Sequence, residues 1–235
     1  MIHNKILALT LLLFIQFSAF GSHEIYLIHG FKGFKRNMHK IDKHLQEQNF
    51  TTKNYGYKSS IELDSLGKQL YEEIKTSKID TVSFVTFSMG ALVFRSMLQY
   101  SVEDKDFPKI FRIVMIAPPN GGANVANFYA SNAVFRCLLG PNIQKMKTDS
   151  TSYANNLPKP YNIELGIIAG VRKKERGYNR FIKGDNDGVV ALDNTKLGME
   201  KDFIMVKGRH NRLIRKKHVS FLVSTFLKTG VFNML

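Results

Sequence analysis

The sequence of 235 residues contains almost no cysteine, and this shortage excludes two kinds of architecture. Cys137 is the single cysteine, so no disulfide can form within the chain and no cysteine-based metal site can be built. Two further signatures are missing. The acidic loop that begins at Asp185 has valine at its fifth position and no glycine at its sixth, which excludes an EF-hand, and segment 30–33 lacks the spacing of a phosphate-binding loop.

Acidic residues are also scarce. Asp and Glu number 19 against 34 Lys and Arg, which gives a formal net charge of +15. So basic a protein is drawn to anionic lipid head groups, polyanions or nucleic acid, but the lysines are scattered along the chain, which favours ordinary solubility as the explanation. Because the basic residues lack both an aromatic-interleaved strand platform and a recognition-helix pattern, no specific nucleic-acid partner is expected.

Only one long hydrophobic run is conspicuous, from Ile6 to Phe20, and it is short for a membrane span. It follows a lysine-bearing N-terminus, and small residues occupy Ala19 and Gly21, the −3 and −1 positions of a cut after Gly21. Residues 1–22 are therefore predicted to be a cleaved signal peptide, which implies a periplasmic or secreted protein. The alternative is an uncleaved segment that anchors the protein to a membrane.

Internal repeats and low-complexity linkers are absent, so residues 23–235 are predicted to form one domain. Short apolar segments alternate with amphipathic ones, which predicts an α/β fold whose mostly parallel central sheet has helices on both faces. The predicted strands are 24–28, 54–57, 81–85, 110–117, 163–170 and 203–206. The predicted helices are one capped by Asn37, one over 63–74, one from Met89 to Tyr100 and one over 219–227.

Segment 123–161 interrupts this alternation, because it is less regular and holds several large apolar residues. We interpret it as an insertion that forms a cap or lid over a pocket. The alternative is an ordinary crossover helix with long loops.

The stretch from Thr81 to Tyr100 has the layout of a nucleophile elbow, in which a buried strand turns at once into a helix with serine at the corner. Ser88 occupies the corner and Gly90 follows two residues later. The helix N-terminus then points its free N–H groups at a developing oxyanion. Thr86 stands where a glycine is usual. The alternative is that Ser88 is an ordinary helix N-cap.

Functional groups of a parallel sheet collect beyond the carboxyl ends of its strands. Ser88, Asp187 and His210 are all predicted to lie there. A serine hydroxyl needs a base to become a nucleophile, which the imidazole of His210 can supply, and the carboxylate of Asp187 can fix the imidazole tautomer. The backbone N–H groups of Met89 and Phe31 would then form the oxyanion hole.

Other residues compete for these roles. His210 is preferred to His218 because it directly follows a strand and a glycine, and Asp187 is preferred to its neighbours Asp185 and Asp193 because of its Asn-Asp-Gly-Val-Val setting. For the Asn-Asp-Gly segment the alternative is a simple turn. His29 is read as a structural hydrogen-bonding residue ahead of the oxyanion loop.

Several motifs together resemble those of the small bacterial α/β-hydrolases of the lipase and acyltransferase kind, over nearly the whole chain after residue 22. They are Leu-Ile-His-Gly-Phe (27–31), Phe-Ser-Met-Gly (87–90), Ile-Ala-Pro-Pro-Asn-Gly-Gly (116–122), Asn-Asp-Gly-Val-Val (186–190) and Gly-Arg-His-Asn (208–211). The resemblance implies the α/β-hydrolase fold and a triad of Ser88, Asp187 and His210. It also implies a substrate-binding region that includes His29, Gly30, Pro118, Pro119 and Asn120. Thr86 for glycine and Phe87 for a frequent histidine depart from the family pattern.

The resemblance implies a serine hydrolase that cleaves carboxylic esters, most of all lipid-like acyl esters, without a metal or an organic cofactor. An acyltransferase with the same triad is one alternative. A catalytically inactive binding protein held at an anionic membrane surface is another, and the basic cluster near His210 fits such a surface. That cluster comprises Arg209, Arg212, Arg215, Lys216 and Lys217. The sequence leaves the oligomeric state open.

Overall fold

The computed structural model describes residues 22–173 and 176–233. The predicted signal peptide therefore lies almost entirely outside the described residues and stays a prediction. Within the described ranges, no helix is both long enough and apolar enough to cross a membrane.

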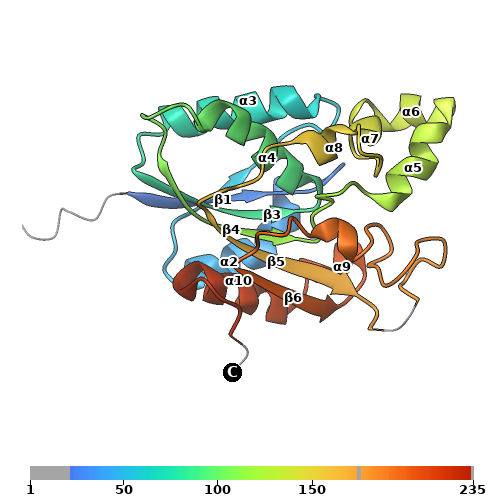
Figure 1. The fold of residues 1–235 in the computed structure, drawn as a ribbon. Helices are drawn as coiled ribbons and strands as arrows, with labels where there is room; N and C mark the ends of the chain where they lie inside the picture. Colours follow the sequence, from blue (N-terminus) through green and yellow to red (C-terminus); the bar gives the residue numbers. More distant parts are fainter. Residues whose placement is uncertain (1–21, 174–175, 234–235) are drawn as a thin grey trace, which may run out of the picture.

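Six parallel strands form one sheet in the order β2-β1-β3-β4-β5-β6 (Figure 1). The strands are β1 (His23–Ile28), β2 (Thr52–Tyr55), β3 (Thr81–Phe87), β4 (Lys109–Ile116), β5 (Glu164–Val171) and β6 (Asp202–Lys207). The predicted α/β class and parallel sheet are confirmed. The predicted strand bounds differ by a few residues, most at β2, which begins at Thr52 and ends before Gly56 and Tyr57.

Helices cover both faces of the sheet. Helices α3 (Leu63–Thr76) and α4 (Met89–Ser101) pack on one face, and α2 (His39–Glu47) and α10 (Lys217–Thr229) pack on the other. The middle strand β3 shows why its sequence is apolar throughout. Val82 and Phe84 point into the core under α3 and α4, whereas Val85 and Phe87 point into the core under α2 and α10.

The first helix starts differently from the prediction. A short 3₁₀ turn, η1 (Lys35–Met38), precedes α2, so α2 begins at His39 and Asn37 is not its N-cap. The side chain of Asn37 instead accepts a hydrogen bond from the backbone N–H of Phe34 at 2.9 Å, which closes the 3₁₀ turn.

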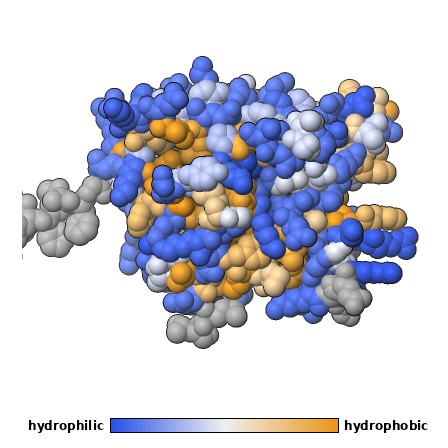
Figure 2. Space-filling view, in the orientation of Figure 1, coloured by the Kyte–Doolittle hydropathy of each residue, from blue (hydrophilic) through white to orange (hydrophobic). Residues whose placement is uncertain are grey.

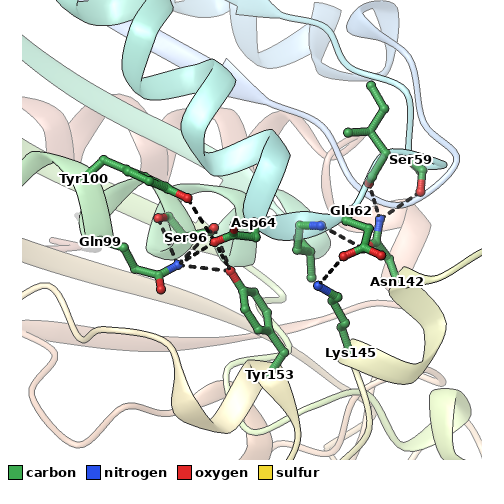
Figure 3. A network of polar contacts seen from close by, with 11 residues as sticks. Ser59, Glu62, Asp64, Ser96, Gln99, Tyr100, Asn142, Lys145 and Tyr153 are labelled. Atoms are coloured by element: carbon green, nitrogen blue, oxygen red, sulfur yellow. Dashed lines mark hydrogen bonds and ion pairs between the residues drawn. The ribbon is translucent and has the colours of Figure 1, made fainter.

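Segment 123–161 folds into four short helices beyond the carboxyl ends of the strands (Figure 1). They are α5 (Asn124–Ser131), α6 (Ala133–Leu139), α7 (Asn142–Lys145) and α8 (Tyr153–Asn156). Helices α7 and α8 are tied to the sheet domain by a polar network (Figure 3). The Tyr153 hydroxyl bonds to Asp64 at 3.2 Å and to Ser96 at 2.9 Å, and Lys145 pairs with Glu62 at 2.8 Å.

Helices α5 and α6 carry several exposed apolar side chains. Figure 2 shows apolar side chains gathered on this end of the molecule. Phe128, Val134 and Leu138 are each about two-thirds exposed there. That segment 123–161 acts as a cap or lid stays a prediction.

Replacing Asn142 with alanine is expected to lower the free energy of unfolding by about 2 kcal/mol or more. The Asn142 side chain is fully buried, accepts from the Leu63 N–H at 2.9 Å and donates to the carbonyl oxygens of Ser59 and Ile61. Urea unfolding followed by circular dichroism measures the effect. Gln144→Ala, an exposed position on the same helix, is the matched control. Equal stability of the two variants would contradict the prediction.

Candidate active site

Ser88 sits in the backbone conformation that a nucleophile elbow requires. It joins β3 directly to α4 with φ 51° and ψ −125°, a region that non-glycine residues rarely occupy. Its N–H donates to the Ile116 carbonyl oxygen at 2.9 Å, which holds the corner against β4. Gly90 is required two residues later, because a Cβ there would lie 2.5 Å from the Ile28 carbonyl oxygen and 2.7 Å from that of His29.

Thr86, one of the two departures from the family pattern, is fully buried next to this corner. Its hydroxyl oxygen has no hydrogen-bond partner among the residues that the structure describes. The elbow backbone nevertheless has its strained geometry, so a β-branched residue at this position is compatible with the turn.

Ser88, His210 and Asp187 form one hydrogen-bonded line. The Ser88 Oγ lies 2.9 Å from Nε2 of His210, and the His210 Nδ1 lies 2.6 Å from Oδ2 of Asp187. The exposed fractions are 8 % for Ser88, 6 % for His210 and 2 % for Asp187, so the line is nearly closed to solvent. In such an environment the carboxylate holds the proton on Nδ1 and leaves Nε2 free to accept the serine proton.

Hydrogen bonds within the loop that carries Asp187 fix its conformation. Oδ1 of Asp187 accepts hydrogen bonds from the N–H groups of Val189 and Val190, both at 2.9 Å, so Oδ2 is the oxygen that faces His210. The neighbouring Asn186 is completely buried, and its side-chain amide donates to the carbonyl oxygens of Asn179, Ile182 and Gly184. The Asn-Asp-Gly motif therefore sets both the loop shape and the carboxylate orientation.

The competing side chains lie elsewhere. His218 is exposed at the start of α10, and Asp185 accepts hydrogen bonds from the backbone of Arg172 and Lys173. Asp193 is highly exposed beside Lys196. Of these histidines and aspartates, the structure brings only His210 and Asp187 to Ser88.

Two backbone donors are available at the corner. Neither the N–H of Phe31 nor that of Met89 donates a hydrogen bond within the described part of the chain. Phe31 follows β1, and Met89 begins α4 directly after β3. Strands β1 and β3 are neighbours, and the strand order reverses between them, because β2 lies on one side of β1 and the later strands lie on the other. Free N–H groups at such a point suit a developing negative charge.

A cavity of about 690 Å³ opens at Ser88, a size typical of small-molecule sites. Ser88, His210, Phe31 and Phe87 contribute to one side of it. Most of its wall is apolar and comes from the insertion. The main residues of that wall are Val125, Ala126, Tyr129, Phe135, Leu138 and Ile143.

Comparison with solved structures identifies the architecture. No protein-family model matches the sequence, and no curated protein matches it significantly. The mature form of the Bacillus licheniformis lipase BlEst2 superposes with a TM-score of 0.68 at 17 % identity, covering 91 % of this chain and 93 % of that one. The Staphylococcus hyicus lipase superposes with a TM-score of 0.58 at 12 % identity, covering 88 % of this chain and 93 % of the lipase. An extracellular α/β-hydrolase from a Paenibacillus species superposes with a TM-score of 0.52 at 14 % identity, covering 87 % of this chain and 98 % of that protein.

The chain has the α/β-hydrolase fold. Its site lies where this fold places ligands, beyond the carboxyl ends of the strands. Among residues 22–173 and 176–233, no group of three or more His, Cys, Asp or Glu side chains is placed to hold a metal ion.

Only some of the five predicted substrate-binding residues line the cavity or the hollow beside it. Pro119 lines the cavity, and Gly30 lines a smaller hollow beside it. Pro118 and Asn120 are buried outside the lining, and the Asn120 amide donates to the Thr195 carbonyl oxygen at 2.8 Å. His29 is also buried outside the lining, so in this geometry its side chain supports the loop after β1.

Contacts with Tyr57 and Gly30 hold the His29 side chain in place. Its ring stacks on Tyr57 with centroids 4.2 Å apart, and Nδ1 lies 2.9 Å from the Gly30 carbonyl oxygen. Nδ1 must therefore carry the proton, and Nε2 accepts from the Tyr57 N–H at 3.4 Å. Burial lowers the pKa of His29 below its ordinary value of 6.5, although the hydrogen bonds to Gly30 and Tyr57 oppose this shift.

We expect His29 to make the protein less stable in mild acid. The unfolded chain takes up the proton near pH 6.5 while the folded chain resists it, so stability is present above that pH and is lost as pH falls toward the folded pKa. His29→Asn should reduce the slope of the free energy of unfolding against pH by up to about 1.4 kcal/mol per pH unit. Urea unfolding between pH 5 and 7 measures this, with the exposed His39→Asn as control. An unchanged slope in His29→Asn would contradict the prediction.

Arg95 is the residue that sequence analysis missed. It lies in α4, is 1 % exposed, and its guanidinium donates to four backbone carbonyl oxygens at 2.5–3.1 Å. These carbonyls belong to Asn120, Ala154, Leu157 and Pro158. Arg95 therefore ties the elbow helix to the loop after β4 and to the base of the insertion. A single charge within the apolar run 91–98 was the available signal.

Proposed function

We propose that this α/β-hydrolase is a carboxylic ester hydrolase that acts on esters with an apolar acyl chain. The observation that carries the proposal is the hydrogen-bonded line Ser88–His210–Asp187 beside a mostly apolar cavity. The structural similarity to lipases supports it at the level of the fold.

The chemistry follows from the geometry. Ser88 Oγ attacks the ester carbonyl carbon while Nε2 of His210 takes its proton, and the Asp187 carboxylate stabilises the resulting imidazolium. The N–H groups of Phe31 and Met89 donate to the oxyanion, each contributing about 3 kcal/mol in the transition state. His210 then protonates the leaving alkoxide, and an acyl-enzyme forms on Ser88.

Water completes the cycle. It attacks the acyl carbon as His210 again takes a proton, and the collapse of the second tetrahedral intermediate releases the acid and restores Ser88. An alcohol in place of water would give an acyltransferase, so the products distinguish the two activities. The mostly apolar wall supplied by α5, α6 and α7 suits the acyl chain.

Labelling with a fluorophosphonate probe tests the proposal, because such probes react with a serine that its base has already activated. We expect mass spectrometry to find the label on Ser88 and expect Ser88→Ala to take up none. The matched control is Ser131→Ala, an exposed serine on α5. Folded protein without label, alone and with lipid vesicles, would overturn the esterase proposal in favour of an inactive binding protein.

A further inference from the structure

A second hollow, of about 590 Å³, adjoins the cavity that contains Ser88. Four of its lining residues are lysine or arginine, namely Lys32, Arg36, Lys40 and Arg215, and we call it the basic hollow. Lys32 belongs to both lining sets, so the two spaces meet at this residue.

A third, smaller hollow of about 170 Å³ borders both. It shares Phe31 and Phe87 with the cavity at Ser88, and it shares Asn37 and Arg215 with the basic hollow. The cavity at Ser88 and the basic hollow therefore lie next to each other, which places the four cations near an ester carbonyl bound at Ser88.

The cations of the basic hollow have no acidic partner. The lining contains no Asp or Glu, and within the described part of the chain none of the four forms a salt bridge. The two lysines donate only to backbone carbonyl oxygens, Lys32 to Leu138 at 3.2 Å and Lys40 to Arg215 at 3.5 Å. Four unneutralised cations around one hollow repel one another, and an oxyanion would relieve that repulsion.

The fold, rather than one run of sequence, gathers these charges. Lys32 follows β1, Arg36 lies in η1, Lys40 lies in α2, and Arg215 follows α9 (His210–Leu213). The cluster that the sequence predicts near His210 is divided, because Lys216 and Lys217 line a different hollow beside β6. Only Arg215 of that cluster faces the basic hollow.

We propose that the basic hollow binds the phosphate group of an acyl-ester substrate while the acyl chain occupies the cavity at Ser88. This inference rests on the proposed ester hydrolysis and names the substrate class. Guanidinium and ammonium donors match phosphate oxygens in charge and in hydrogen bonding. Hydrolysis would release a carboxylic acid and a phosphate-bearing alcohol.

Two esters that differ only in the phosphate test this inference. They are 1-octanoylglycerol 3-phosphate and 1-octanoylglycerol, both assayed as monomers. We expect kcat/KM to be at least about tenfold higher for the phosphate ester, which corresponds to about 1.4 kcal/mol. The preference should shrink as NaCl is raised from about 20 mM to about 500 mM, because salt screens an exposed hollow.

Arg36→Gln/Arg215→Gln should bring the ratio of the two kcat/KM values to within about twofold of unity, since both guanidinium partners of the phosphate are gone. Lys105→Gln/Lys109→Gln is the matched control. It also removes two exposed positive charges, but it does so at the amino-terminal end of β4, whereas the basic hollow lies beyond the carboxyl end of β1, so it should keep the wild-type ratio.

Titration of glycerol 3-phosphate and of inorganic phosphate by calorimetry gives a readout that needs no turnover. Binding to wild type that weakens at least tenfold in Arg36→Gln/Arg215→Gln supports a phosphate site, and absence of binding overturns it. If the probes bind but the two esters react equally, the hollow is a general anion site and the substrate inference is overturned.

The remaining outcomes separate this inference from the proposed function. Equal kcat/KM for the two monomeric esters, or a preference that Arg36→Gln/Arg215→Gln retains, overturns the inference while ester hydrolysis stands. A preference that appears only on anionic vesicles also overturns it and assigns the charges to a membrane surface. Failure of both esters to react, together with unlabelled Ser88, identifies a failure of the proposed function itself.

Discussion

Replacing Asp187 with asparagine is expected to lower kcat for ester hydrolysis by about 10⁴-fold while the protein stays folded. The reason lies in how the Asp187 loop holds this side chain. The N–H groups of Val189 and Val190 both donate to Oδ1, so an asparagine must keep its oxygen there. Its NH₂ group then faces Nδ1 of His210.

This arrangement forces the wrong tautomer on the base. With an NH₂ donor opposite, Nδ1 of His210 must accept, so Nε2 carries the proton and cannot take one from Ser88. Steady-state kinetics on a soluble ester measures the loss. The matched control is Asp193→Asn, which changes a highly exposed carboxylate and should leave kcat unchanged. A folded Asp187→Asn enzyme with activity within tenfold of wild type would rule out the assigned role of Asp187.

Replacing Arg95 with methionine is expected to cost about 3 kcal/mol or more of folding free energy. Four backbone carbonyl oxygens, from Asn120 to Pro158, lose their donor at once, and a methionine can satisfy none of them. Burial lowers the pKa of Arg95 to about 10, so the group is still charged at neutral pH, and four carbonyl dipoles compensate its charge.

Urea unfolding monitored by circular dichroism measures this cost. Arg212→Met is the matched control, because Arg212 is exposed and its loss should change stability by less than about 0.5 kcal/mol. Arg95→Lys should fall between the two, since an ammonium keeps the charge but has fewer donors. If Arg95→Met were as stable as Arg212→Met, Arg95 would not be the tie between α4 and the insertion.

Much of the fold was predictable because its signals are local. Patterns of residues close together in the sequence predict the β3 strand and the α4 helix, and the elbow needs only Ser88 and Gly90 at fixed spacing. The start of α2 was mispredicted for the same reason. Asn37 has the residue type of an N-cap, but its side chain closes a 3₁₀ turn on Phe34 instead.

Sequence by itself determined the alternation of strands and helices, the parallel sheet and the order of Ser88, Asp187 and His210 along the chain. Periodicity and short motifs carry that information, since each depends on residues a few positions apart. Tertiary structure alone decided which groups meet: the Arg95 guanidinium with the carbonyl oxygens of Asn120, Ala154, Leu157 and Pro158, and Arg215 with Lys32 and Arg36 around one hollow. Those groups are far apart in sequence, so only the path of the folded chain brings their charges together.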